Sequence, residues 1–392
     1  MTTTINNEHK KLNVPNLRFP EFQGEWEEHL LGNISDVTKL AGFEFTKYVT
    51  YEDNGNIIAI RGLNCKNGSL DLRDVKYIDN SDFSKLSRSK LYTGDILYTY
   101  VGTVGEVAVV DKNDKYYLAP NVSRIRLSKD YNSDFIKQML GSKKFYNQIV
   151  FPLIATSSQP ALSMENLRKF KLKVPSIREQ TKIASLLNAI DERIATQNKI
   201  IEDLKKLKSA ISKKLLCNDK WTTYKIQDIA EIGRGRVISS VEIEKQRHPL
   251  YPVYSSQTSN DGIMGYLDNY MFDGEYITWT TDGANAGTVF YRNGKFNCTN
   301  VCGTLKIHLQ FDCHFVSLVL QQATQKYVSS NLANPKLMNN TMASIKIRMP
   351  DMETQKRLSK VFQTLDSRLL VHQCTYEMYL REKQYLLNQM FI

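Results

Sequence analysis

The chain has 392 residues, 42% hydrophobic and 24% charged, and its 52 Lys and Arg against 41 Asp and Glu give a formal net charge of +11. This length predicts more than one domain, and the composition excludes a disordered or fibrous chain. No apolar run reaches the length of a membrane span, the N-terminus lacks a secretory signal, and 6 irregularly placed cysteines do not form a disulfide framework. We therefore expect a soluble, cytoplasmic, multidomain protein whose positive charge favours a polyanionic partner.

The first module is expected at 25–175, after an N-terminal arm at 1–24. Residues 95–100 and 106–110 have the β-branched and aromatic composition of strands, whereas 133–149 has a helical pattern. The module is therefore predicted to be α+β, with a twisted sheet and polar loops.

The second half of the chain repeats the first. Residues 170–175, Phe-Lys-Leu-Lys-Val-Pro, match residues 345–350, Ile-Lys-Ile-Arg-Met-Pro, in chemical type and 175 positions later. Single residues keep this offset further on: Gln180 with Gln355, and Asp191 with Asp366. Trp26 corresponds to Trp221 at an offset of 195, and 92–97 resembles 272–277 at an offset of 180. We therefore expect a second α+β module at 218–350, shortened in its loops.

Long helices are expected at 176–217 and 351–392. Apolar residues recur in both with alternating spacings of four and three, the pattern of a coiled-coil seam. The predicted seam residues are Ile183, Leu187, Ile190, Ile194, Ile201, Leu204, Ile211, Leu215, Leu358, Phe362, Leu365, Leu369, Tyr376, Tyr379, Leu386 and Met390. Polar residues fill the remaining rungs: Gln197, Lys208, His372 and Lys383. Because neither stripe is stable alone in water, we expect an antiparallel coiled coil between the two helices. The alternative is that each helix packs on its own module.

Catalytic motifs are missing from the sequence. There is no Gly-x4-Gly-Lys-Ser/Thr phosphate loop, no Asp/Asn-Pro-Pro-aromatic methyltransferase loop and no Gly-x-Ser-x-Gly elbow. The spacing of Cys298, Cys302, His308, Cys313 and His314 is not that of a zinc site, so we expect buried thiols and no metal. The sequence therefore predicts a binding protein without catalytic residues of its own.

These features resemble the specificity subunits of type I restriction–modification systems, over essentially the whole chain. The resemblance rests on Pro-Asn-Leu-Arg-Phe-Pro-Glu-Phe at 15–22 followed by Trp26, on Gly-Asp-Ile-Leu at 94–97, and on Pro-Ser-Ile-Arg-Glu-Gln-Thr-Lys-Ile at 175–183. The two-copy arrangement completes it. The second copy departs mildly, since Thr354 stands where the first copy has Glu179.

The resemblance implies that 25–175 and 218–350 are target recognition domains, each reading one half of a bipartite, asymmetric DNA sequence. The helices at 176–217 and 351–392 would fix the spacer and dock modification (methyltransferase) subunits, which bind S-adenosylmethionine and methylate adenine. Restriction subunits, which use ATP and Mg²⁺ to cut DNA, would join the larger complex. No cofactor is expected in this chain. Two alternatives stay open: a specificity subunit of a type IIB-like system, and a coiled-coil scaffold with two ligand-binding modules.

Loop residues with donors for phosphates and base edges are the candidates for contact with double-stranded DNA. In the first module these are Lys39, Arg61, Tyr100, Thr103, Ser157, Ser158 and Gln159. In the second they are Arg234, Arg236, Ser255, Ser256, Thr281, Asn285, Asn334 and Lys336. The alternative for each is a solvated or turn-stabilising polar residue. Trp26 and Trp221 are expected to be core anchors.

Overall fold

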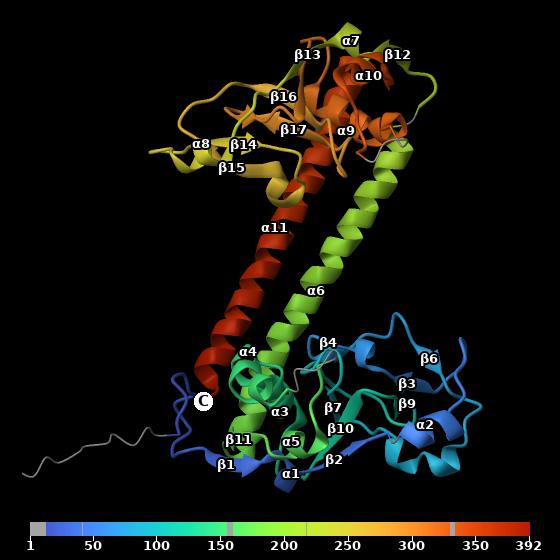
Figure 1. The fold of residues 1–392 in the computed structure, drawn as a ribbon, viewed down its shortest axis with the longest axis vertical. Helices are drawn as coiled ribbons and strands as arrows, with labels where there is room; N and C mark the ends of the chain where they lie inside the picture. The colour runs from blue at the N-terminus through green and yellow to red at the C-terminus, as the bar shows by residue number, and fades with distance from the viewer. Residues whose placement is uncertain (1–12, 41, 155–159, 217, 330–333) are drawn as a thin grey trace, which may run out of the picture. The chain divides into compact units, whose positions relative to one another are not determined.

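The structure is a computed structural model that describes residues 13–392 apart from 41, 155–159, 217 and 330–333 (Figure 1). The chain divides into two compact units. Unit 1 comprises Met1–Asn198 and Cys374–Ile392, and unit 2 comprises Lys199–Gln373. Within the described ranges, no helix combines the length and apolarity needed to cross a bilayer.

Unit 1 is built on a four-stranded antiparallel sheet in the order β2-β10-β7-β8, with a three-stranded sheet β6-β3-β9, a two-stranded sheet β1-β11 and a hairpin β4-β5 beside it. Its strands are β1 (Glu27–Leu30), β2 (Ser35–Lys39), β3 (Ile58–Ile60), β4 (Cys65–Lys66), β5 (Ser69–Leu70), β6 (Lys76–Tyr77), β7 (Ile96–Thr99), β8 (Val107–Val109), β9 (Tyr116–Leu118), β10 (Val122–Leu127) and β11 (Lys171–Val174). Its short helices are α1 (Leu31–Ile34), α2 (Gly42–Tyr48), α3 (Ser133–Leu140), α4 (Lys143–Phe145) and α5 (Met164–Arg168).

Unit 2 repeats this plan with sheets β13-β19-β16-β17, β15-β14-β18 and β12-β20. Its strands are β12 (Thr222–Lys225), β13 (Ala230–Arg234), β14 (Tyr251–Tyr254), β15 (Ile263–Leu267), β16 (Glu275–Thr280), β17 (Val289–Asn293), β18 (Asn297–Cys298), β19 (Cys302–Ile307) and β20 (Lys346–Met349). Its short helices are α7 (Ile226–Ile229), α8 (Ser240–Glu244), α9 (Cys313–Ala323) and α10 (Asn339–Ser344). The expected duplication of an α+β module is confirmed.

Two local expectations need correction. The predicted helix at 133–149 is interrupted, because Ser142 accepts a hydrogen bond from the Phe145 amide and starts the separate helix α4, which a π-helical turn at Tyr146–Val150 follows. The sheet registers also place Ile96 opposite Ile125 and Ile277 opposite Leu305. Equivalent residues of β7 and β16 are therefore 181 positions apart rather than 180.

The chain has two long helices, α6 (Ile177–Leu215) and α11 (Met352–Met390). The first part of α6 and the last part of α11 belong to unit 1, and the remainder of both helices belongs to unit 2. In unit 1, Asp191 of α6 accepts a 2.5 Å hydrogen bond from the amine of Lys383, and Arg193 donates to the Tyr379 hydroxyl at 3.2 Å. Residue numbers rise along one helix as they fall along the other, so the pairing is antiparallel, as expected.

In unit 2, Lys208 of α6 forms an ion pair with Asp366 of α11. This pair is the repeat equivalent of Asp191–Lys383, since each partner is shifted by 175 positions. Lys208 and Lys383 are two of the polar residues in the predicted seam series, and each forms an ion pair with an aspartate of the opposite helix. Of the predicted seam residues, Ile183, Leu187, Ile190, Ile201, Leu358, Phe362, Leu365 and Met390 are buried. Leu215 is 36% exposed, and the others are half-buried.

Each module is attached to the start of its long helix by a buried glutamine. The side-chain oxygen of Gln180 accepts a 2.9 Å hydrogen bond from the Asn132 amide, and its side-chain nitrogen donates to the Pro175 carbonyl at 2.8 Å. Gln355 makes the same two bonds, to the Asp312 amide and the Pro350 carbonyl, at 2.9 and 2.8 Å. The repeated glutamine therefore links the helix start to the residue that precedes α3 or α9.

The N-terminal arm adds a contact to unit 1. Arg18 donates from Nε and Nη2 to the carboxylate of Glu179 at 2.8 and 2.7 Å, and that carboxylate is 2% exposed. Trp26 is buried and packs edge-to-face on Phe135, with ring centroids 5.8 Å apart. In unit 2, Thr354 instead donates to Asp351, and Trp221 is half-buried and packs edge-to-face on Phe315.

Replacing Ile190 with Asp is expected to lower the free energy of unfolding by at least about 3 kcal/mol, because a charge then replaces a buried apolar side chain. Leu365→Asp, at the repeat-equivalent position of unit 2, should do the same. The matched control is Thr196→Asp, which adds the same charge at an exposed position of α6. Thermal or denaturant unfolding of the full chain measures the effect. Equal stability of Ile190→Asp and the control would contradict the seam assignment.

Candidate nucleic-acid interface

In unit 2, predicted site residues gather around Asp282, which follows β16. Arg234, the last residue of β13, donates from Nη2 to the Thr281 hydroxyl at 2.8 Å and to Asp282 Oδ2 at 3.2 Å. The amine of Lys336 lies 3.6 Å from the other carboxylate oxygen. The site thus has two cations on one carboxylate, and Arg234 and Lys336 stay 35% and 41% exposed. Such partly exposed cations suit contacts to phosphates or to guanine edges.

Backbone hydrogen bonds bring the other segments to this cluster. The Gly283 amide donates to the Pro335 carbonyl at 3.0 Å and the Leu337 amide donates to Thr281 at 2.9 Å, which places Asn334 and Lys336 beside the loop at 282–287. The side-chain nitrogen Nδ2 of Asn285 donates to the Ser256 carbonyl at 3.3 Å, so the segment containing Ser255 and Ser256 joins the same face. Arg236 points to other partners, since it forms an ion pair with Glu242.

Unit 1 has an equivalent cluster around Tyr100. The amine of Lys39, the last residue of β2, lies 5.4 Å from the centre of the Tyr100 ring. The Gly102 amide donates to Pro160 at 2.9 Å and the Leu162 amide donates to Tyr100 at 2.8 Å, which repeats the two bonds made by Gly283 and Leu337 in unit 2. Burial raises the pKa of Tyr100, so its hydroxyl stays a neutral donor. Thr103 is exposed in the same loop. Ser157, Ser158 and Gln159 lie outside the described residues.

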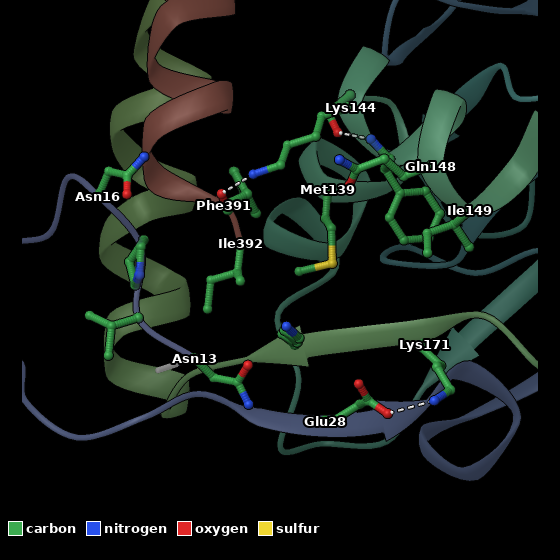
Figure 2. A pocket seen from close by; sticks show the side chains of 15 residues that line it. Asn13, Asn16, Glu28, Met139, Lys144, Gln148, Ile149, Lys171, Phe391 and Ile392 are labelled. Atoms are coloured by element: carbon green, nitrogen blue, oxygen red, sulfur yellow. Dashed lines mark hydrogen bonds and ion pairs between the residues drawn. The ribbon is translucent and has the colours of Figure 1, made fainter. Parts of the chain in front are cut away.

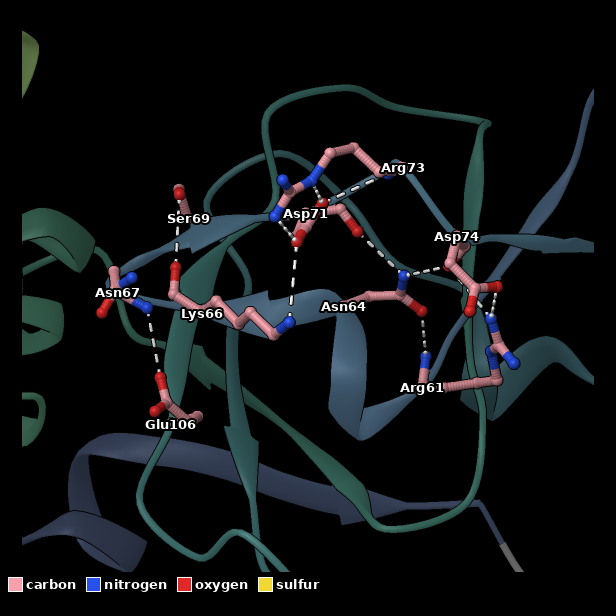
Figure 3. A network of polar contacts seen from close by, with 9 residues as sticks. All are labelled: Arg61, Asn64, Lys66, Asn67, Ser69, Asp71, Arg73, Asp74 and Glu106. Atoms are coloured by element: carbon pink, nitrogen blue, oxygen red, sulfur yellow. Dashed lines mark hydrogen bonds and ion pairs between the residues drawn. The ribbon is translucent and has the colours of Figure 1, made fainter. Parts of the chain in front are cut away.

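Arg61, the remaining candidate of unit 1, belongs to a polar network that includes the hairpin β4-β5 (Figure 3). Its Nη2 donates to Asp74 Oδ1 at 2.8 Å, so part of its donor capacity is used inside the protein. The network also holds cations that the sequence reasoning missed. Asp71 accepts from Arg73 at 2.9 and 2.7 Å and lies 3.8 Å from the amine of Lys66. The hydrogen bond from Arg73 holds the pKa of Asp71 well below its usual range.

A signal for this hairpin is present in the sequence. Asn67 and Gly68 both have positive φ angles, 51° and 81°. An Asn-Gly pair between two short strands is the strongest short-range signal for a hairpin turn of this kind.

The three cysteines considered for a metal and His314 are buried, whereas His308 is exposed. Burial raises the pKa of Cys302 to about 11 and that of Cys313 to about 12. His314 Nδ1 lies 2.8 Å from the Ser359 hydroxyl, and burial lowers its pKa. Among the residues that the structure describes, no group of three or more His, Cys, Asp or Glu side chains is placed to hold a metal ion.

A cavity of about 400 Å³ in unit 1 is lined by residues 13–16, α4, β11 and the residues Phe391 and Ile392, among others (Figure 2). Lys144 donates across it to the Phe391 carbonyl at 3.0 Å. Its lining, all within the described residues, contains one carboxylate, Glu28, which pairs with Lys171 at 3.1 Å, and neither cysteine nor histidine.

The family model of the type I restriction modification DNA specificity domain matches residues 23–206 and 218–375. A putative type I specificity subunit of Mycoplasma pneumoniae is 36% identical over 242 residues, which cover 59% of this chain and 90% of that protein. A second one from the same organism is 36% identical over 231 residues, which cover 58% of this chain and 96% of that protein. The MpnII type I restriction enzyme specificity subunit of the same organism is 39% identical over 178 residues, 45% of this chain and 53% of that protein.

Among solved structures, the S subunit of a type I restriction–modification system from M. genitalium has a TM-score of 0.71 and 16% identity, and the match covers 97% of this chain and 99% of that one. A structure described as showing complex assembly and conformational transition of a type I system gives a TM-score of 0.54 at 14% identity, over 93% of this chain and 97% of that one. At these identities, the likeness establishes the shared fold.

Replacing Asp282 with Asn is expected to strengthen binding to random double-stranded DNA several-fold. The change removes the negative charge that faces Arg234 and Lys336, so the slope of log affinity against log salt should steepen by up to about one. Fluorescence anisotropy at several salt concentrations measures both quantities. The control is Asp273→Asn, an exposed carboxylate of the same unit. Identical slopes for Asp282→Asn and wild type would show that this cluster does not face the DNA.

Proposed function

The chain belongs to the family of type I restriction–modification DNA specificity domains, and we propose that it is the sequence-specificity subunit of such a system. It would bind double-stranded DNA and have no active site of its own. The observation that carries this proposal is the repeated cluster: Lys39 beside Tyr100 in unit 1 and Arg234 beside Thr281 in unit 2, each next to the same pair of backbone hydrogen bonds. Each unit would read one half of a split target.

The different side chains of the two clusters explain why the target would be asymmetric. Unit 1 presents an amine over a phenol ring, whereas unit 2 presents a guanidinium and an amine on one carboxylate. An arginine pairs best with a guanine edge, and an amine makes a less directional contact. Two recognition surfaces of unequal chemistry would select two unequal half-sites.

The activities of the complex would reside in its partners. We propose that α6 and α11 set the number of unread base pairs and dock modification subunits in the cytoplasm. Those subunits would bind S-adenosylmethionine and methylate adenine. Restriction subunits, with ATP and Mg²⁺, would complete the nuclease. The amino-acid sequence of this chain supports the division, because it holds neither a phosphate-binding loop nor a methyltransferase motif.

The test is selection of bound sequences from a random duplex library by the chain assembled with its modification subunits. The proposal predicts enrichment of one split sequence, with two short specified parts around an unspecified spacer. Affinity for the selected duplex should also fall steeply as salt rises, because phosphate contacts release counterions. Enrichment of no motif by an assembled complex would refute the proposal and favour the scaffold alternative.

Single substitutions should relax the two halves separately. Lys39→Ala is expected to weaken base preference in one half and Arg234→Ala in the other, each by roughly tenfold at the affected position. Lys225→Ala, which removes an exposed cation at the end of β12, is the control and should leave both halves intact. If Lys39→Ala and Arg234→Ala relax the same half, the assignment of one half-site to each unit is wrong.

A further inference from the structure

A loop of unit 2 has a backbone conformation that L-amino acids rarely adopt. The loop, Ser255–Gly262, follows β14, and three consecutive residues near its end have positive φ: Asn260 at 49°, Asp261 at 53° and Gly262 at 83°. Two successive non-glycine residues in the left-handed region are unfavourable, and such strain persists only where surrounding contacts impose it.

Arg292 of β17 supplies those contacts. Its side chain is 4% exposed, and its guanidinium carbon lies 3.6 Å from the centre of the Tyr254 ring and 4.4 Å from that of Phe290. From this position between two rings, Nη1 donates to Asp261 Oδ2 at 2.6 Å and Nη2 donates to the Asp261 carbonyl at 2.8 Å. A buried, stacked and paired guanidinium is a rigid anchor.

The loop is also tied at its base and to the candidate cluster. The Ser255 amide donates to the Gly262 carbonyl at 2.9 Å, which closes the loop, and the Gln257 side chain donates to the Ile263 carbonyl. The bond from Asn285 to the Ser256 carbonyl connects it to the loop that carries Asp282. The loop thus extends the face that contains Arg234 and Lys336.

The tip of the loop presents small polar side chains to solvent. Thr258, Ser259 and Asn260 are all exposed. An asparagine amide has a donor and an acceptor side by side, the arrangement that pairs with N6 and N7 of adenine. The carboxylate of Asp261, which would repel phosphates, is neutralised by Arg292. The protein therefore holds a tip suited to base edges in place on a backbone with positive φ angles.

We propose that the loop Ser255–Gly262 is a base-reading element of unit 2, in which Asn260 contacts a base edge and Arg292 is a positioning residue that holds the loop in its reading conformation. This inference rests on the proposed function, because it deepens the assignment of unit 2 to one half-site. Unit 1 differs at this point, since its chain continues from β3 into the segment that contains Arg61 and the hairpin β4-β5.

The variant Asn260→Gly distinguishes an effect on base recognition from an effect on the stability of the fold. Glycine adopts positive φ without a penalty, so the variant should melt at or above the wild-type temperature, while losing the amide. Selection from a random duplex library by the assembled complex should then show roughly tenfold weaker discrimination at one position or more of the half-site that Arg234→Ala relaxes. The other half-site should be unchanged.

Two further variants complete the test. Asn67→Gly makes the same change at an exposed, left-handed asparagine of unit 1 and should leave the half-site of unit 2 intact. Arg292→Lys keeps the charge but loses the planar two-point contact, and it should relax the same positions as Asn260→Gly.

The outcomes are distinguishable. Base reading by this loop would be overturned if Asn260→Gly left the half-site of unit 2 at wild-type strength. It would also be overturned if the variant weakened binding to all sequences equally or changed the other half-site. Unchanged positions with Arg292→Lys would overturn the positioning role. A wild-type complex that selects no split motif would instead refute the proposed function itself.

Discussion

The antiparallel pairing of α6 with α11 inside each unit is the constraint on which the other features depend. Each helix has an apolar stripe that cannot remain exposed in water, so it needs a partner helix along its length. The Asp191–Lys383 and Lys208–Asp366 pairs sit at the polar rungs of that stripe. A shift in register would leave these charges against apolar residues without a partner, which costs more than the pairs themselves contribute. The charged rungs therefore select one register.

The register of the helix pair determines where the first turn of each long helix lies, and the first turn in turn holds the α+β module of its unit. Gln180 and Gln355 make the same pair of hydrogen bonds in their units, one to the strand-to-helix turn and one to the cap of α3 or α9. Those short helices pack on the four-stranded sheets whose loops carry the candidate DNA contacts. A chain of hydrogen bonds and packed side chains thus leads from the coiled coil to the recognition surface within each unit.

The repeat made the architecture predictable from the sequence. Equivalent residues such as Asp191 and Asp366 keep their offset because they make the same contact twice. The strands β7 and β16 were harder to match, because the second copy has one more residue between Gly274 and Ile277 than the first has between Gly94 and Ile96. A shift of one residue exchanges the two faces of a strand. The sequence showed the Gly-Asp/Glu similarity but not which side chain faces the core.

The recognition surface was predicted less completely, for physical reasons. Arg61 and Arg236 have the right chemistry for DNA, but only the fold shows that Asp74 and Glu242 engage their guanidinium groups. Arg292 was not predicted at all, because a charged residue in a strand is normally solvent-facing. Its burial depends on Phe290 of the same strand and on Tyr254 of β14, which belongs to another sheet. Partners distant in sequence decide which polar residues remain available to a ligand.

The most direct test of the central claim is sequencing of methylated bases in DNA from a methylation-free host that expresses a cognate modification subunit, with and without this chain. The account predicts a split adenine-methylation motif that appears only when the chain is present. An assembled complex that contains the chain and leaves no such motif in the DNA would contradict it.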